Sequence, residues 1–352
     1  MALNIKACLE EAIRRSASDF HIVVGIPPTL RVHGELVIME QSPVTEEAAR
    51  LAILGILNSE QKQTFGQDWE LNFAYSLPNL GRFRVNVYAA RGNIEAAFRI
   101  ISVAPRNMTE LGLPAVVSQL CKKSSGLILI TGPAGQGKTT TMASMINQIN
   151  REGRKCRMVT IEDPIEYLHE NINSVVVQRE VGIDTKSFNT ALMQSLRQDP
   201  NIICIGEMRD LETIGTALTA AETGHLVMGT LHAPDAAQCI DRIIDVFPAG
   251  QQQQIRIQLA SSLEGVLSQK LLPRKNGNGR VVAVEVLIGT SAVKNIIRDR
   301  KTELLYGVMQ TGSAYGMVLM DAVLKDLYEK DVISLDTALS KARDPKAIKE
   351  ER

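Results

Sequence analysis

The middle of the chain alternates short apolar runs with stretches of helical periodicity. The runs, which are apolar at nearly every position, cover residues 126–131, 157–161, 202–205 and 226–231. Uniformly apolar strands are typical of a parallel sheet that is covered on both faces, and the intervening helices supply that cover. The pattern therefore predicts an α/β core with a mostly parallel sheet.

The first hundred residues follow a different pattern, in which short helices and strands are mixed. Apolar spacing predicts helices over residues 5–15 and 46–57. Strand-like runs are found at residues 20–24, 29–32, 70–75, 82–89 and 94–101, with turn residues between the last three. We expect a small α+β domain with an antiparallel sheet over residues 1–104.

Two further segments complete the expected organisation. Residues 105–114 have turn-forming residues at both ends and little periodicity, which predicts a linker. The second domain is expected over residues 115–352. Its last part, from residue 290 to about residue 342, has only helical patterns, so a helical extension of the core is predicted.

The composition is that of an ordinary globular protein. Of the 352 residues, 45% are hydrophobic and 22% are charged, and 39 basic residues balance 39 acidic residues. A chain without net charge has no overall field that would attract nucleic acid or an anionic membrane surface. No segment approaches the roughly 20 apolar residues of a transmembrane helix. The five cysteines include no C-x-x-C pair, which argues against a zinc site and favours a reducing cytoplasm.

The first apolar run is followed by a match to the phosphate-binding motif G-x-x-x-x-G-K-[ST]. Its residues are Gly132, Pro133, Ala134, Gly135, Gln136, Gly137, Lys138, Thr139 and Thr140. A loop between a strand and a helix can cradle phosphates with backbone N–H groups, so ATP with Mg²⁺ is the predicted ligand. We expect Lys138 to reach the β- and γ-phosphates and the Thr139 hydroxyl to ligate Mg²⁺. A chance glycine-rich turn is the alternative.

Acidic residues follow two of the other apolar runs. Glu207 ends the run at 202–205, as a Walker B carboxylate would, and Glu162 and Glu166 follow the run at 157–161. ATP hydrolysis needs carboxylates in such positions to hold the metal and to orient or deprotonate water. A single acid at a strand end is often a helix cap or a solvated charge. Two clusters after a phosphate-binding loop favour the catalytic interpretation.

Two histidines flank the apolar run at 226–231, His225 before it and His232 after it. Histidines at opposite ends of a strand are poorly placed to share one metal ion. We interpret them as γ-phosphate sensors or couplers, and a purely structural role is the alternative.

Taken together, these motifs resemble those of the secretion ATPase superfamily and, within it, the type IV pilus retraction ATPases. The similarity extends from Ala17 to about Ile333. Residues 162–166 resemble the Asp box of that family, residues 206–210 its Walker B box and residues 224–232 its His box. Ala134 and Gln136 stand where relatives usually have Thr and Ser. The four-cysteine module that is typical of the pilus-extension and type II secretion relatives is not found in this sequence.

The resemblance implies a RecA-like core after a PAS-like N-terminal domain. It makes Glu166 the base that activates water, with Glu162 as the close alternative, and Glu207 the residue that holds Mg²⁺ directly or through water. Arginines of the N-terminal sheet are expected to reach the phosphates. Arg82, Arg84 and Arg99 fall in the matching strands, and the alternative is that they are exposed strand charges.

The resemblance also implies partners and a location. A homo-hexameric ring would rotate its N-terminal domains against its cores at the inner face of the cytoplasmic membrane. An inner-membrane pilus platform protein would be its partner, and a paralogous ATPase a possible second one. No direct nucleic-acid partner is expected.

The sequence leaves three alternatives open. One is another motor of the superfamily, such as an accessory retraction ATPase or a motor for type II secretion or DNA transfer. Another is a scaffold that binds ATP without useful hydrolysis, which the two carboxylate clusters argue against. The third is a nucleic-acid motor, which the balanced charge and the 4% aromatic content argue against.

Overall fold

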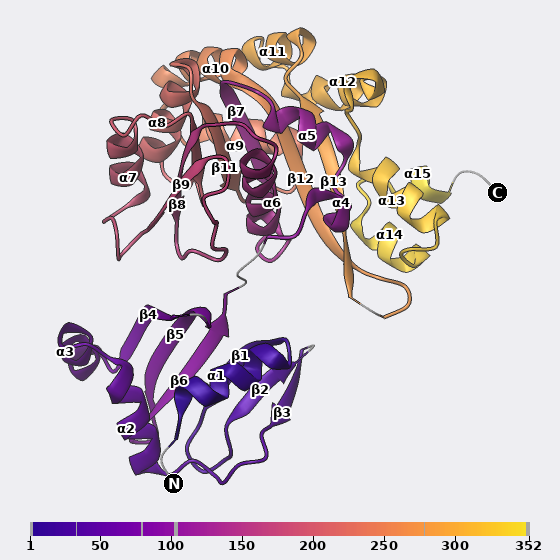
Figure 1. Cartoon of the computed structure of the whole chain (residues 1–352). Coiled ribbons are helices and arrows are strands. Elements are labelled where there is room, and N and C mark those ends of the chain that lie inside the picture. Colours follow the sequence, from indigo (N-terminus) through magenta and orange to yellow (C-terminus); the bar gives the residue numbers. More distant parts are fainter. Residues whose placement is uncertain (1–2, 33, 79, 102–104, 278, 350–352) are drawn as a thin grey trace. The chain divides into compact units, whose positions relative to one another are not determined.

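The computed structural model describes residues 3–32, 34–78, 80–101, 105–277 and 279–349, which form two compact units (Figure 1). Residues 1–104 make up most of the first unit, and residues from 105 onward make up most of the second. The expected domain boundary adjoins residues 102–104, which lie outside the described residues.

The first unit is an antiparallel sheet with its own helices. Its elements are α1 (Ile5–Arg14), β1 (Ala17–Ile22), β2 (Thr29–Val32), β3 (Glu35–Ile38), α2 (Glu46–Ile56), α3 (Ser59–Asp68), β4 (Glu70–Leu77), β5 (Gly81–Ala90) and β6 (Asn93–Ile100). The described strands are ordered β3-β2-β1-β6-β5-β4, with every neighbouring pair antiparallel. The predicted α+β sheet is therefore present, and β3 and α3 are elements that the sequence pattern did not indicate.

Alternation along the strands of the first unit places its core on one face of the sheet. On β5, Phe83 and Val85 are fully buried, whereas Arg84 between them is exposed. Phe20 on β1 and Phe98 on β6 lie with their ring centroids 5.3 Å apart, inside a core that also contains residues of α1 and α2. A period of two residues is what a sheet with one buried face requires.

The second unit is larger and has more elements. They are α4 (Met108–Leu111), α5 (Ala115–Cys121), β7 (Gly126–Thr131), α6 (Lys138–Arg151), β8 (Arg157–Glu162), β9 (Val175–Glu180), α7 (Phe188–Ser195), β10 (Ile202–Ile205), α8 (Leu211–Glu222), β11 (Leu226–Leu231), α9 (Ala236–Asp245), α10 (Ala249–Ser262), β12 (Leu263–Pro273), β13 (Arg280–Ile288), α11 (Ser291–Arg298), η1 (Thr302–Leu304), α12 (Leu305–Thr311), η2 (Ser313–Tyr315), α13 (Met320–Glu329), α14 (Leu335–Lys341) and α15 (Pro345–Lys349).

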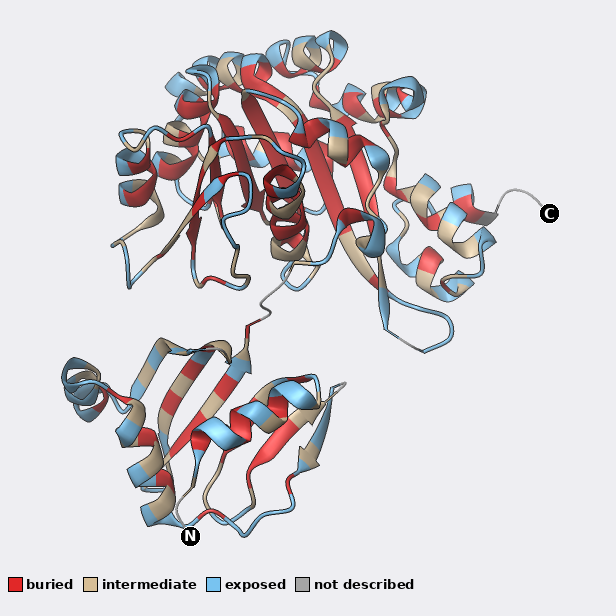
Figure 2. Cartoon of the chain, in the orientation of Figure 1, coloured by how far each residue is buried: buried red, intermediate tan, exposed pale blue. Residues whose placement is uncertain are grey.

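The sheet of the second unit is mostly parallel, as predicted. Its described strands are ordered β13-β12-β7-β11-β10-β8-β9, and only β13 runs antiparallel to its neighbour. On β7, Ile128 and Ile130 pack with residues of α5 and α6, whereas Leu127 and Leu129 pack with residues of α8, α9 and α10. Figure 2 shows these central strands buried along their length. Helices thus cover both faces of the sheet.

The expected linker contains a short helix. Asn107 caps α4 by accepting a hydrogen bond from the Glu110 N–H at 2.8 Å. The turn residues at both ends of the segment concealed this single helical turn, because four residues are too few for a periodic pattern. The strands β9, β12 and β13 were also not indicated by the sequence. β12 and β13 lie at one end of the sheet and β9 at the other.

The predicted helical extension follows β13 and packs against the β12–β13 hairpin. Leu272 of β12 and Ala283 of β13 share an apolar cluster with Met320 and Leu324 of α13. Beside it, the buried carboxylate of Glu285 accepts hydrogen bonds from the N–H of Ala236 at 2.9 Å and from the N–H of Met320 at 3.1 Å. One side chain therefore satisfies the first N–H groups of both α9 and α13.

All five cysteines are free and buried. Among the described residues, no helix combines the length and the apolar character that a membrane crossing needs.

Candidate active site

The candidate site lies where the parallel strands of the second unit end. In the sheet, β7, β11, β10 and β8 are adjacent and point the same way, so their carboxyl ends meet at one edge. The phosphate-binding loop follows β7, His232 follows β11 and Glu207 follows β10. Ligands of open α/β sheets bind outside this edge.

Glycine opens the loop because the loop touches β12 there. Gly132 has φ +145°, and a Cβ atom at this position would lie 2.6 Å from the backbone oxygen of Gln269. Gly137 has φ +82° and precedes α6, whose N-terminal N–H groups point toward the loop.

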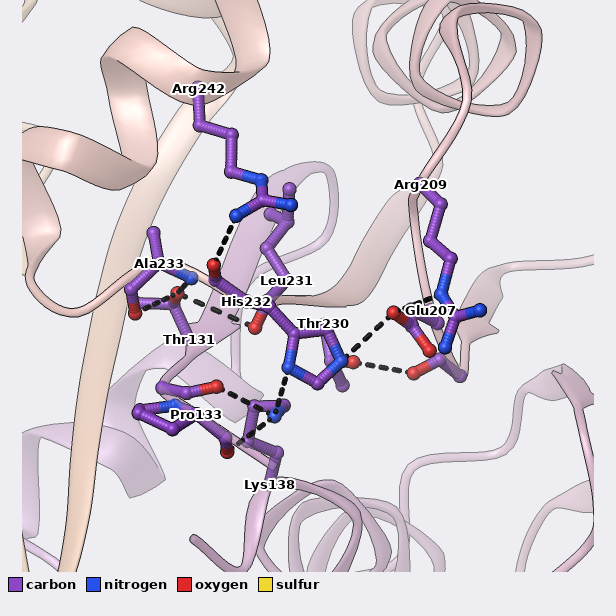
Figure 3. Close-up of polar contacts among 12 residues, drawn as sticks. Thr131, Pro133, Lys138, Glu207, Arg209, Thr230, Leu231, His232, Ala233 and Arg242 are labelled. Atoms are coloured by element: carbon purple, nitrogen blue, oxygen red, sulfur yellow. Dashed lines mark hydrogen bonds and ion pairs between the residues drawn. The ribbon is translucent and has the colours of Figure 1, made fainter. Parts of the chain in front are cut away.

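The Lys138 ammonium donates to three acceptors around the loop (Figure 3). Its Nζ lies 2.7 Å from the Gly132 oxygen, 3.0 Å from the Pro133 oxygen and 3.3 Å from Nδ1 of His232. An ammonium group can only donate, so Nδ1 of His232 is the acceptor and its Nε2 carries the proton. That Nε2 lies 2.9 Å from Oε1 of Glu207. The imidazole therefore joins Lys138 to Glu207.

Glu207 is held by two partners at once. The same Oε1 atom accepts from Nε of Arg209 and from His232. Burial raises the pKa of the Glu207 carboxyl, but the Arg209 hydrogen bond and the neighbouring positive charges outweigh it and leave the pKa below its usual range. Burial and the Lys138 charge lower the pKa of His232, and Glu207 opposes them in part. The site therefore keeps a charged carboxylate beside a neutral imidazole at neutral pH.

Residues that the sequence did not single out hold the backbone of His232 and Ala233 in place. The Thr131 hydroxyl donates to the Ala233 oxygen and accepts from the Ala233 N–H, both at 2.8 Å. The guanidinium of Arg242 donates to the backbone oxygen of His232. Thr131 is the last residue of β7, directly before the phosphate-binding loop. Arg242 lies on α9, and nothing in its local sequence points to the site.

The two Asp-box glutamates differ in exposure. Glu162, at the end of β8, is buried and accepts from the Thr160 hydroxyl at 2.6 Å and from Nε2 of Gln178 at 3.1 Å. Glu166 lies beyond the strand and is exposed. Between them, the N–H of Ile165 is bound by Oε2 of Glu180 at 3.2 Å, which fixes the path of the intervening loop.

His225 lies far from this chain's own phosphate-binding loop. His225 precedes β11 and Gly126 opens β7, and the two lie together at the amino edge of the sheet, where the Gly126 N–H donates to the His225 oxygen at 3.0 Å. At about 3.3 Å per residue, β11 separates His225 from the phosphate edge by roughly 20 Å. Its Nδ1 lies 3.0 Å from the Ala220 oxygen, which is a structural contact.

The three predicted arginines belong to the first unit. Arg84 and Arg99 are directly opposite each other on β5 and β6, and both are exposed. Nε of Arg99 lies 3.0 Å from Oδ1 of Asp19. Arg82 is half-buried on the same strand as Arg84. Because β-strand side chains alternate, Arg82, Arg84 and Arg99 share the face of the sheet opposite the apolar core.

Oxygen donors suited to Mg²⁺ are found on the second unit. Thr139 lies in the first turn of α6 and is half-buried, and the Glu207 carboxylate is partly exposed. Mg²⁺ keeps several waters and takes one or two protein oxygens together with phosphates, so these residues fit it. Among the described residues, no group of three or more His, Cys, Asp or Glu side chains could hold a metal ion by itself.

A phosphate-binding loop, a strand-end glutamate and a histidine at the carboxyl edge of a mostly parallel sheet define a P-loop nucleotide-binding protein. The model of the family described as type II/IV secretion system protein matches residues 1–341, and the chain belongs to this family, whose ATPases have a RecA-like fold. The predicted family and fold class are therefore confirmed.

Relatives within the family point to pilus motors. The chain is 43% identical over 343 residues to the type IV pilus retraction ATPase PilT of Pseudomonas aeruginosa, covering 97% of this chain and 99% of that one. It is 36% identical over 340 residues to the type IV pilus ATPase PilU of the same organism, covering 97% and 89%. A crystal structure of the pilus retraction motor PilT with bound ADP matches with a TM-score of 0.92 and 43% identity, covering 99% of this chain and 100% of that one.

Proposed function

We propose that this chain is an ATP-hydrolysing motor that retracts type IV pili and so drives twitching motility. The observation that carries the proposal is the chain of contacts from Lys138 through His232 to Glu207 beside the phosphate-binding loop. The near full-length similarity to the retraction ATPase PilT supports the choice of cargo.

The loop from Gly132 to Thr140 receives the nucleotide phosphates. Backbone N–H groups at the start of α6 bind them, and Lys138 exchanges its contacts with the Gly132 and Pro133 oxygens for phosphate oxygens. Thr139 and Glu207 would hold Mg²⁺, Glu207 directly or through water. When bound, the ion neutralises charge on the β- and γ-phosphates.

Glu166 is our choice for the base that activates water, and Glu162 is the alternative. A base must have an oxygen free to accept a proton from water. Glu162 is buried, and its Oε1 already accepts two hydrogen bonds. Glu166 is exposed and its loop is fixed through Ile165.

His232 couples the phosphate loop to the metal-binding carboxylate. Its two ring nitrogens contact Lys138 and Glu207, so a movement of Lys138 toward a phosphate removes one of the two contacts that orient the ring. We infer that this change reports the presence of the γ-phosphate to β10 and β11.

Motion of the first unit completes the proposed cycle. Arg82, Arg84 and Arg99 would deliver positive charge to the phosphates from a neighbouring surface and lose that contact after hydrolysis. A homo-hexamer at the inner face of the cytoplasmic membrane would turn these movements into rotation of a membrane platform protein.

The catalytic assignment is tested by ATP turnover of purified variants. Glu166→Gln and Glu207→Gln are each expected to lower turnover by about 100-fold, because each amide lacks the charge that its role needs. Glu212→Gln, which replaces an exposed residue on α8, is the matched control, and this variant should hydrolyse ATP at the normal rate. Normal turnover by both test variants would refute the assignment.

The cargo is tested in cells. Deletion of the gene should increase the number of surface pili and abolish twitching, and the wild-type gene should restore both whereas Glu207→Gln should not. Loss of pili would instead indicate an extension motor. A deletion strain that retracts its pili normally, and fails only when the pili pull against a load or when a second ATPase is also present, would indicate an accessory motor of the PilU type.

A further inference from the structure

The strand β12 continues past the end of its neighbour β7. The two strands pair in parallel as far as Ser268 and Thr131, where β7 ends and the chain enters the phosphate-binding loop. Beyond that point β12 runs on to Pro273, and its other edge stays paired with β13. The edge of residues 269–273 that faces the loop therefore has no strand beside it in the described part of the chain.

A side chain of the loop takes the place of the missing strand. Oε1 of Gln136 accepts a hydrogen bond from the N–H of Leu271 at 2.6 Å. Leu271 is also paired with Val282 on the other side, so this bond completes the pairing of β12 at this residue. Gln136 lies in the middle of the loop, between the glycines at 135 and 137.

Two further contacts bring the same segment of β12 against the loop and its helix. The Gln269 oxygen is the atom that leaves no room for a Cβ at Gly132. The fully buried Gln269 side chain donates from Nε2 to the hydroxyl of Thr141 on α6 at 2.7 Å. The start of the loop, its middle and the helix that follows it therefore all rest on β12.

We propose that Gln136 is a positioning residue for the nucleotide, because its amide fixes the middle of the phosphate-binding loop to β12. The loop binds phosphates with backbone N–H groups, whose directions depend on the path of the loop. A bond from the middle of the loop to a sheet strand reduces the conformations that must be given up on binding. The inference rests on the proposed function only in taking ATP and ADP as the ligands.

Glutamine suits this task through its length. Its oxygen is three bonds from Cβ, whereas a serine oxygen is one bond away and cannot reach the Leu271 N–H from the same backbone. The contact also continues away from the site, since Nζ of the adjacent Lys270 donates to the oxygen of Lys341 on α14 at 2.7 Å. Nucleotide binding should therefore change the mobility of β12.

The test compares ADP affinity of the full chain and two variants by titration calorimetry. Gln136→Met keeps the length of the side chain but has no comparable acceptor, and Gln136→Ser is too short. Each is expected to raise the Kd for ADP and the KM for ATP by about tenfold, because a loop that is not held to β12 must be ordered when phosphates bind, and to leave kcat within about twofold. Gln251→Met, an exposed change on α10, is the control and should bind like the wild type.

Two results would overturn the proposal. One is a Kd for ADP within about twofold of the wild type in both variants. The other is a fall in kcat with no change in Kd, which would point to a role in the chemical step. Loss of kcat in Glu207→Gln with normal ADP binding would leave the Gln136 test intact.

A measurement on the unmodified chain keeps the proposal testable if the variants fold poorly. ADP should slow the hydrogen exchange of the Leu271 amide, because the loop that holds this N–H becomes more rigid when phosphates bind. Exchange of Leu271 that is unchanged by saturating ADP would contradict the proposal. A wild-type chain that binds neither ADP nor ATP would refute the proposed function as well.

Discussion

Each ring nitrogen of His232 faces a different charged group, and this makes the imidazole sensitive to both. Lys138 on one side disfavours the protonated ring, and Glu207 on the other side favours it. The pKa of His232 lies below the reference value of about 6.5. Folding therefore favours the neutral ring. This contribution to stability is complete above the unfolded pKa and is lost as the pH falls through the lower, folded pKa.

Removing the Lys138 charge and removing the Glu207 charge should move the His232 pKa in opposite directions. Lys138→Met should raise it, because the repelling charge is gone, and Glu207→Gln should lower it further. Each shift should be about 0.5 to 1 unit, because side chains that are partly exposed are screened by water. NMR titration of labelled histidine rings measures it, and His232→Gln identifies the signal. A pKa that is the same in both variants would contradict the described contacts.

Gly132 is the residue at which the loop has least freedom. Gly132→Ala places a methyl group 2.6 Å from the Gln269 oxygen in a backbone region unsuited to alanine. We expect a loss of about 2 kcal/mol in the free energy of unfolding, within the usual cost of overpacking, together with weaker ADP binding. Gly250→Ala on α10 meets no atom within 4 Å and serves as the control. Denaturant unfolding measures the stability of both variants, and equal stabilities would refute the argument.

Residue-level prediction succeeded where one local motif carried the information. The loop from Gly132 to Thr140, Glu207 and His232 lie at the predicted edge because each follows a buried parallel strand. The same polarity argument places His225 and His232 at opposite edges of the sheet. Gln136 and Gln269 could not have been predicted, because their roles depend on the position of β12, which the sequence did not indicate.

At the scale of elements, the strands that were missed explain how the site is supported. β12 alternates polar and apolar positions imperfectly, and β9 carries polar side chains at its carboxyl end, so neither resembles the uniform runs of β7 or β11. A helical turn such as α4 is too short for periodicity to detect. β9 lies at an edge of the sheet, whereas β12 lies inside it between β13 and β7.

Glu285 links two helices through one carboxylate, and its removal should affect both. Glu285→Ala leaves the buried N–H groups of Ala236 and Met320 without their acceptor. We expect a loss of about 2 kcal/mol or more in the free energy of unfolding, since each unpaired buried N–H costs about 1 to 3 kcal/mol. Urea unfolding measures it.

A matched control is available on α13. Glu329 is 59% exposed and pairs with Lys325 at 3.9 Å, so Glu329→Ala should cost less than about 0.5 kcal/mol. If the Glu285 variant were no less stable than this control, the hydrogen bonds from Ala236 and Met320 to Glu285 would make no net contribution to the free energy of unfolding.

At the scale of the whole molecule, each unit has a core of its own. The first unit buries Phe20, Phe83 and Phe98 completely, and the second unit has separate clusters on both faces of its sheet. The division into two parts could be read from the change in strand pattern along the sequence. The roles of the charged residues on the face opposite the core of the first sheet could not be predicted, because exposed strand charges have no distinctive pattern.

A fragment of residues 1–101 should therefore fold by itself. We expect cooperative thermal unfolding with the helical signal of α1, α2 and α3. Phe20→Ala should cost about 3 to 5 kcal/mol and leave the fragment close to unfolded. Leu36→Ala, at a side chain that is 59% exposed, should have little effect. Circular dichroism measures all three, and a fragment without a cooperative transition would show that the first unit needs the rest of the chain.

The burial of all five cysteines has a practical consequence for observing movement. Burial raises the pKa of the Cys121 and Cys239 thiols to about 12 and that of Cys204 well above its usual value. The thiolate is the nucleophile that attacks a maleimide, so buried thiols with raised pKa values should not react with a maleimide dye. Cysteines introduced at exposed Glu60 and Glu212 would then carry a donor and an acceptor dye, one on each unit, without prior removal of any native cysteine. Energy transfer between them could follow a single motor through its cycle.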